Sequence, residues 1–142
     1  MLNSLLENVQ PQEVAQKKEE TILDAAIVCR TVEGKGRGVF AQRAIREGEI
    51  VECAPVVPMA KEDVPEDSPP DGYVLDWDED TEGEEHALVL GYIMLYNHSN
   101  APNLRFESDL EEYTVTAIAS RNIEAGEELT WDYNCELWFD PQ

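Results

Sequence analysis

The stretch Asn97-His-Ser-Asn-Ala-Pro-Asn103 directly follows the longest apolar run of the chain, Ala87–Leu95. A polar turn in this place leaves backbone amide and carbonyl groups free, and such groups suit hydrogen bonding to a polar ligand. An ordinary turn after a helix is the alternative interpretation. The apolar run has about half the length that a membrane-spanning helix needs, so we expect it in a folded core.

Two further segments stand out on either side of this stretch. Near the C-terminus, Gly126-Glu-Glu-Leu-Thr-Trp-Asp-Tyr133 would place Trp131 and Tyr133 on the same face of a strand, because side chains alternate along it. Taken alone, this pattern favours a core strand. Near the N-terminus, Gly36-Arg-Gly38 lacks the third glycine and the helix of a dinucleotide site, and by itself it is typical of a hairpin turn.

The net charge of the chain limits the kinds of molecule that it is expected to bind. The 142 residues include 31 acidic and 10 basic residues, which gives a formal net charge of −21. This balance disfavours direct binding to nucleic acid or to anionic membranes, because phosphate neutralisation needs a basic surface. A cationic protein is the favoured partner, since a field of one sign steers the opposite sign. The alternative is that the acidic charge only maintains solubility.

Cysteine and histidine usage argues against a metal site or a disulfide framework. The chain has three scattered cysteines and two histidines, which suits neither a zinc module nor a set of disulfides. The segment that begins at Asp76 lacks the glycine and glutamate that a calcium loop requires. We therefore predict no metal. A cytoplasmic location is expected, with the nucleus, of the source organism or of a host, as the alternative.

The pattern of short β-like runs predicts a mainly β domain over residues 25–142, preceded by an extension over residues 1–24. Leu2, Leu5 and Leu6 leave two interpretations of that extension open, a frayed tail or a short docking or dimerising helix. We expect no internal repeat. The acidic segment 62–85 should be mostly exposed, and 85–96 is the one expected core helix. Strands are expected at residues 26–29, 50–57, 113–119 and 128–133, and a glycine-rich turn over residues 33–41 is expected to enter another strand.

In this order, the three segments resemble the SET-domain family of protein-lysine methyltransferases, and the resemblance covers about residues 25–139. Lys35-Gly-Arg-Gly-Val-Phe-Ala is similar to the first glycine loop of the family. Asn97-His-Ser-x-x-Pro-Asn103 resembles its most distinctive motif, and Glu127-Glu-Leu-Thr-x-Asp-Tyr133 resembles its closing motif. The resemblance implies a fold of small curved sheets with few short helices and a pseudoknot-like threading of the C-terminal segment.

The resemblance also implies roles for individual residues. Tyr133 takes the place of the active-site tyrosine, Tyr73 that of an aromatic residue lining the active site, and Trp131 that of a residue that influences how many methyl groups are added. S-adenosylmethionine (SAM) is the implied cofactor. The residues implied to bind it are Lys35, Gly36, Arg37, Gly38, Tyr96, Asn97, His98 and Trp138.

The chain departs from the family in two places. Met94-Leu-Tyr96 replaces the Arg-Phe-Ile that often precedes Asn-His-Ser, and the cysteine-rich zinc modules of many members are missing from this sequence. Trp138 and Phe139 are candidates for a lid over the substrate channel and for stacking on the adenine, with simple C-terminal packing as the alternative.

The resulting prediction is a SAM-dependent methyltransferase that modifies a lysine of a basic protein such as a histone tail, and that could act as a homodimer. The alternative is a non-catalytic SET-like acidic module that binds basic proteins.

Overall fold

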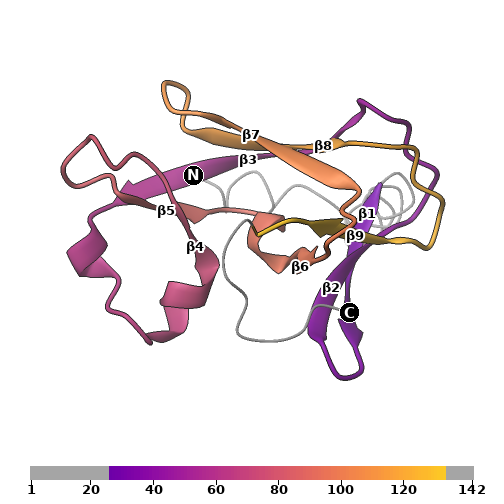
Figure 1. Cartoon of the computed structure of the whole chain (residues 1–142), viewed down its shortest axis with the longest axis horizontal. Coiled ribbons are helices and arrows are strands. Elements are labelled where there is room, and N and C mark those ends of the chain that lie inside the picture. Colours follow the sequence, from indigo (N-terminus) through magenta and orange to yellow (C-terminus); the bar gives the residue numbers. More distant parts are fainter. Residues whose placement is uncertain (1–25, 134–142) are drawn as a thin grey trace, which may run out of the picture.

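The structure is a computed structural model that describes residues 26–133. Its strands form two β-sheets, and three short 3-10 helices lie in the connections between strands of the described chain (Figure 1). The strands are β1 (Ile27–Val32), β2 (Gly36–Ala41), β3 (Ile50–Met59), β4 (Val74–Asp76), β5 (His86–Val89), β6 (Asn97–His98), β7 (Leu104–Asp109), β8 (Thr114–Ala119) and β9 (Glu128–Trp131). The 3-10 helices are η1 (Lys61–Asp63), η2 (Pro69–Tyr73) and η3 (Ile93–Leu95).

The smaller sheet has the order β1-β2-β9-β6 and the larger one the order β4-β5-β3-β8-β7. This arrangement confirms the prediction of a mainly β fold with small sheets and few short helices. The pairing of β6 with β9 is parallel, with Asn97 opposite Thr130 and His98 opposite Trp131. Strand β9 therefore lies directly beside the start of the polar stretch Asn97–Asn103.

That polar stretch is joined to β9 by its last residue. Asn103 is buried, its side-chain amide donates to the carbonyl of Glu128 at 2.9 Å, and its side-chain oxygen accepts the amide of Thr130 at 2.9 Å. The Asn103 side chain thus pairs with backbone groups of β9 in the way that a neighbouring strand would. A buried amide that kept neither bond would cost about 1–3 kcal/mol, so the position of Asn103 helps to fix the two motifs together.

Two turns of related sequence connect the sheets, although we expected no internal repeat. Residues 41–50 and 119–128 share Arg, Ile, Gly and Glu at equal spacing. The buried Ile45 and Ile123 exchange both backbone hydrogen bonds, at 2.9 and 2.8 Å. The similarity is confined to the positions that form the turn, while the strands on either side differ, so it is a local turn motif and does not contradict the expectation.

Each of these turns is closed by an exposed ion pair. The Arg43 guanidinium lies 2.7 Å from Glu49, and its hydrogen bond lowers the pKa of that carboxyl. In the second turn Arg121 lies 3.1 Å from Glu127 and lowers its pKa in the same way. Exposed pairs of this kind contribute about 0–1 kcal/mol each, so they support the turns without deciding the fold.

The expected helix over residues 85–96 is wrong. Its first part is strand β5, in which the buried Ala87 and Val89 alternate with half-buried neighbours, and Val89 pairs with Val56 of β3. At Gly91 the backbone has a φ of 121°, which a helix does not allow. Because both faces of β5 are apolar, the sequence shows a continuous apolar run instead of the two-residue alternation of a strand.

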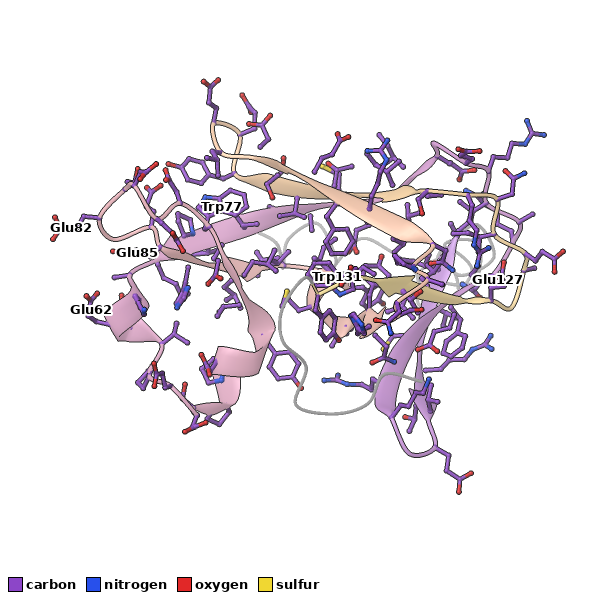
Figure 2. The ribbon with its side chains drawn as sticks, in the orientation of Figure 1. Glu62, Trp77, Glu82, Glu85, Glu127 and Trp131 are labelled. Atoms are coloured by element: carbon purple, nitrogen blue, oxygen red, sulfur yellow. The ribbon has the colours of Figure 1, made fainter. Side chains whose placement is uncertain are left out.

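The acidic segment 62–85 is mostly exposed, as expected, but it also contains β4. This strand pairs with β5, with Val74 opposite Leu88 and Asp76 opposite His86. Figure 2 shows Glu62, Glu82 and Glu85 at the end of the molecule that carries β4 and β5, and Glu127 at the opposite end. Within residues 26–133, no helix is long and apolar enough to cross a membrane.

Candidate active site

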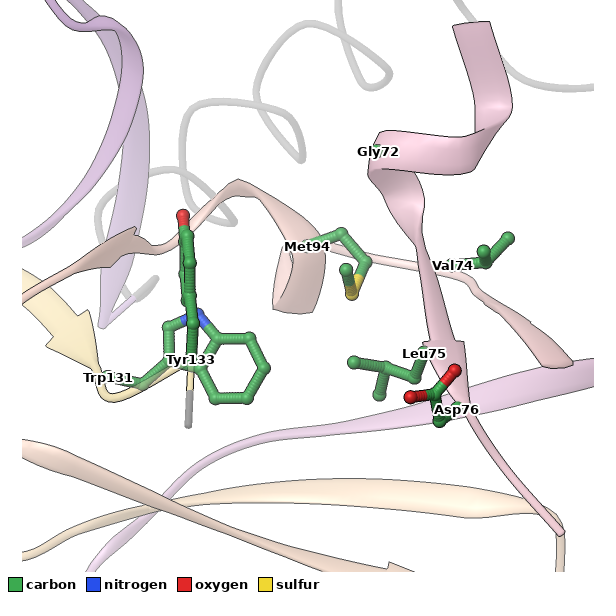
Figure 3. A pocket seen from close by; sticks show the side chains of 7 residues that line it. All are labelled: Gly72, Val74, Leu75, Asp76, Met94, Trp131 and Tyr133. Carbon is green, nitrogen blue, oxygen red and sulfur yellow. The ribbon is translucent and has the colours of Figure 1, made fainter. Parts of the chain in front are cut away.

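Two cavities meet at Tyr133. The first, of about 430 Å³, is lined by the β1–β2 turn, by η2 and η3, and by Asn97. The second, of about 450 Å³, is lined by β4, Met94 and Trp131. Gly72, Met94 and Tyr133 line both of them. Figure 3 shows the second cavity, with Trp131 and Tyr133 facing Leu75 and Asp76 across it.

Tyr133 is fixed at both its side chain and its backbone. Its hydroxyl donates to the backbone carbonyl of Tyr96 at 3.1 Å. Its amide donates to Nδ1 of His98 at 3.0 Å. Its ring packs against those of His98 and Trp131, with centroids 5.1 and 5.2 Å away. A side chain held in this way can present its hydroxyl oxygen at a defined position between the two cavities.

The ring of His98 is buried and both of its nitrogens have protein partners. Nδ1 accepts the Tyr133 amide, so the ring proton lies on Nε2, which donates to the side-chain oxygen of Asn100 at 3.0 Å. The side chain of His98 is 3% exposed. The prediction that His98 binds cofactor therefore stays a prediction for its backbone, while its ring orients Tyr133.

Asn97, which lines the first cavity, is hydrogen-bonded to residues of both β2 and β9. Its side-chain nitrogen donates to the carbonyl of Arg37 at 3.1 Å and to Oε1 of Glu128 at 2.6 Å. A Cβ on Gly38 would come within 2.7 Å of that same Glu128 oxygen. Glycine at position 38 therefore lets β2, β6 and β9 approach closely without displacing the side chains of Asn97 and Glu128. Lys35, Gly36 and Arg37 line the first cavity, whereas Gly38 does not line it and lies against the side chains of Glu128 and Asn97.

The predicted aromatic residues lie at the junction. Tyr73, at the end of η2, lines the first cavity and is half exposed. Trp131 lines the second cavity, where its indole stacks on Phe106 at 4.3 Å and its Nε1 donates to the carbonyl of Tyr96 at 3.2 Å. The structure thus brings Tyr73 to the same site as Trp131 and Tyr133, which lie about sixty residues further along the chain.

Three of the predicted cofactor residues, Gly38, Tyr96 and His98, do not line the first cavity in the described structure. The Tyr96 side chain is fully buried in the core, and its backbone carbonyl is the part that faces Trp131 and Tyr133. Burial, with the neighbouring Glu52 carboxylate, raises the pKa of the Tyr96 phenol above its usual range, so this side chain stays neutral. Trp138 lies outside the described residues, and its predicted role is not tested.

Sequence reasoning missed several residues that shape the site. Glu128 and Asn103 lie inside the quoted motifs, so their membership of those motifs was a signal that could have identified them. Phe106 supports the Trp131 indole from β7, a strand that was not expected. Met94 lines both cavities, but in sequence it is one apolar residue among many.

The two cavities differ in charge. Lys35 and Arg37 are the charged residues on the described wall of the first cavity, and Asp76 is the charged residue on that of the second. The rest of the second cavity is lined by Val74, Leu75, Met94 and aromatic rings. Among residues 26–133, no group of three His, Cys, Asp or Glu side chains is placed to hold a metal ion.

Comparisons with known proteins agree with this geometry. The model of the SET domain family matches residues 36–134. A histone-lysine N-methyltransferase of Schizosaccharomyces pombe, specific for lysine 37 of histone H3, is 29% identical over 124 residues, which are 85% of this chain and 82% of that protein. The crystal structure of a candidate histone methyltransferase of Plasmodium falciparum aligns with a TM-score of 0.61 and 27% identity, over 82% of this chain and 99% of the other.

Proposed function

We propose, from the premise that this chain belongs to the SET domain family, that it transfers methyl groups from SAM to the ε-amine of lysine residues in basic proteins. The observation that carries the proposal is that Tyr133 forms the shared wall of two cavities of different character. One cavity has the polar groups that a charged cofactor needs. The other has the apolar and aromatic wall that a lysine side chain needs.

The residues of the first cavity fit SAM. The carboxylate of SAM suits the cationic Lys35 and Arg37 on the wall of the cavity. The positively charged groups of SAM suit the nearby carboxylate of Glu128, which accepts a hydrogen bond from the cavity residue Asn97. Gly38 leaves the Glu128 side chain in its place next to Asn97, because a side chain on residue 38 would collide with the Glu128 carboxylate. When bound, SAM supplies a methyl group on a positively charged sulfur. We assign its binding to Lys35, Gly36, Arg37, Gly38, Asn97 and the backbone of Tyr96 and His98.

The second cavity suits the alkyl stem of lysine and disfavours its charged form. The amine must be neutral to attack, and reaching that form at pH 7 costs about 4–5 kcal/mol from a reference pKa near 10.4. Apolar walls lower this cost by penalising the ammonium ion. The Tyr133 hydroxyl donates its hydrogen bond to the carbonyl of Tyr96, so towards the amine it acts as an acceptor of an N–H and orients it. We assign no general base.

The substrate is proposed to be a basic protein, with histones as the first candidates. The support is the name of the fission-yeast relative, which acts on histone H3, and the net charge of −21, which attracts cations. Asp76 at the second cavity places one of these charges next to the proposed channel. A catalytic domain over residues 25–142, a cytoplasmic or nuclear location and a homodimer remain predictions.

The test is to incubate the full chain with isotope-labelled SAM and a panel of basic proteins, including histones, and to locate label by mass spectrometry. We expect label on lysine residues of at least one basic protein. Calorimetry with SAM and with the same proteins accompanies this assay. Binding of the proteins without any SAM binding or transfer would favour the non-catalytic acidic module instead.

A further inference from the structure

Glu52 lies on neither cavity, yet its carboxylate makes two directed hydrogen bonds. One oxygen accepts the backbone amide of Tyr92 at 2.8 Å, and the other accepts the hydroxyl of Tyr96 at 2.9 Å. Both donors belong to the segment that runs from β5 through η3 to β6. A carboxylate on β3 therefore holds both ends of η3.

The local backbone is shaped to bring this carboxylate inward. The register of β3 against β8 shifts between Ile50 and Glu52, so that one extra residue separates these two paired positions. Such a bulge redirects the side chains that follow it. On the opposite side, Gly91 has a φ of 121°, and a Cβ there would overlap the Glu52 carboxylate. Close approach of the two segments thus depends on both features.

Tyr96 connects Glu52 to the active site. Its side chain is fully buried and neutral, so it donates to the Glu52 carboxylate. Its backbone carbonyl accepts two hydrogen bonds, from the Tyr133 hydroxyl at 3.1 Å and from the Trp131 indole at 3.2 Å. The same residue is therefore bonded at its side chain by Glu52 and at its backbone by both aromatic residues of the site.

We infer that Glu52 is a positioning residue, which fixes the Tyr96 carbonyl and through it the orientation of the Tyr133 hydroxyl and the Trp131 indole. The expected effect on kcat rests on the proposed methyltransferase function. The expected effect on the orientation of Trp131 and Tyr133 does not depend on that function. A purely stabilising role would lower the melting temperature alone. A positioning role also changes the environment of Trp131 and Tyr133 in the folded protein.

The kinetic test uses Glu52→Gln and Tyr96→Phe in the full chain. Glutamine has one side-chain acceptor oxygen for two donors, and phenylalanine keeps the ring but loses the hydroxyl. We expect each variant to lower kcat about tenfold, as loss of a hydrogen bond to a charged group would, with the Kd for SAM changed less than twofold. In a Tyr133→Phe background, Glu52→Gln should lower kcat by much less than tenfold, because the part of its effect that acts through that hydroxyl is already lost. A full tenfold loss in that background would overturn the inference.

A second readout does not depend on activity. The indole N–H resonance of Trp131 is identified in an NMR spectrum by its disappearance in Trp131→Phe, and Glu52→Gln and Tyr96→Phe should both shift it. The matched controls are Glu111→Gln and Tyr113→Phe, because these residues lie in the exposed β7–β8 turn, outside both cavities. They should leave the resonance and kcat unchanged.

The resonance also separates the two claims. A wild-type chain that transfers no methyl group would refute the proposed function, whereas a shifted indole resonance would still support the link from Glu52 to Trp131. An unshifted resonance in both variants, with the fold retained by circular dichroism, would overturn the inference even in an active enzyme.

Discussion

The backbone amide of Tyr133 donates a 3.0 Å hydrogen bond to Nδ1 of His98. This bond joins the last residue of the closing motif to the second residue of the Asn97–Asn103 stretch. It forms next to the parallel pair in which His98 lies opposite Trp131. The two motifs are far apart in sequence, and here a side chain of one of them accepts a backbone hydrogen bond from the other.

Replacing His98 by leucine should therefore impair turnover more than cofactor binding. The variant keeps the bulk of the buried ring but offers no acceptor to Tyr133. We expect kcat to fall roughly five- to tenfold, the size of one lost neutral hydrogen bond, and the Kd for SAM to rise less than threefold. Calorimetry and steady-state kinetics measure the two quantities. Lost SAM affinity with normal kcat would instead assign the ring to the cofactor.

Gly38→Ala should weaken SAM binding without unfolding the protein. The new Cβ would lie 2.7 Å from Oε1 of Glu128 and 3.1 Å from the side-chain nitrogen of Asn97. Because both neighbours are ends of side chains, they can move apart, but this movement breaks their 2.6 Å hydrogen bond. We expect the Kd for SAM to rise about tenfold, corresponding to about 1.4 kcal/mol, while the melting temperature changes by only a few degrees.

A result of the opposite kind would contradict the assignment of the first cavity. If Gly38→Ala bound SAM as tightly as the wild type, the contact of Gly38 with Asn97 and Glu128 would not be part of the cofactor site.

Trp131→Phe should raise the number of methyl groups added to one lysine. The indole borders the second cavity, where it is stacked on Phe106 and bonded to the Tyr96 carbonyl, so it does not turn away from the cavity. A smaller ring leaves space for a methylated amine. We therefore expect mono- and dimethyl products from the wild type and a shift towards trimethyl product in the variant, measured by mass spectrometry, with SAM binding retained. Efficient trimethylation by the wild type at low enzyme concentration would contradict this argument.

Salt should weaken substrate capture and leave cofactor binding nearly unchanged. Residues 62–85 contain acidic side chains and no Lys or Arg, and within them η2 and β4 line the two cavities. Each exposed charge contributes about 0–1 kcal/mol, but together they raise the encounter rate with a cationic substrate. We expect KM for a basic protein to rise severalfold between about 50 and 200 mM salt, where screening becomes strong.

The matched comparison for this effect is Asp71→Asn with Asp76→Asn against Asp109→Asn with Glu111→Gln. Both pairs remove two charges, but only the first lies in the segment that lines the cavities. The first pair should flatten the salt dependence of KM more than the second. If both pairs of substitutions changed the salt dependence of KM equally, that dependence would come from the net charge of the protein and not from the segment that lines the cavities.

Sequence reasoning located most of β1, β3, β8 and β9 and the motifs that carry unusual polar residues. It failed where both faces of a strand are apolar, as in β5, because the alternation is then invisible. It also missed β4 and β7, whose pairing depends on neighbours distant in sequence.

In the site, the motifs identified Tyr133, Trp131 and Asn97, whereas the side chain of Tyr96 was assigned to the cofactor although it is buried against Glu52. A motif identifies a residue but not which of its groups faces the cavity.

The most direct test of the central claim is the turnover of Tyr133→Phe. This variant keeps the ring packing against His98 and Trp131 and loses only the hydroxyl that lies between the two cavities. We predict a folded protein with near-normal SAM affinity and a kcat lowered by about 10²-fold or more, the usual cost of removing one group that stabilises a transition state. A Tyr133→Phe variant that methylates lysine as fast as the wild type would contradict the account.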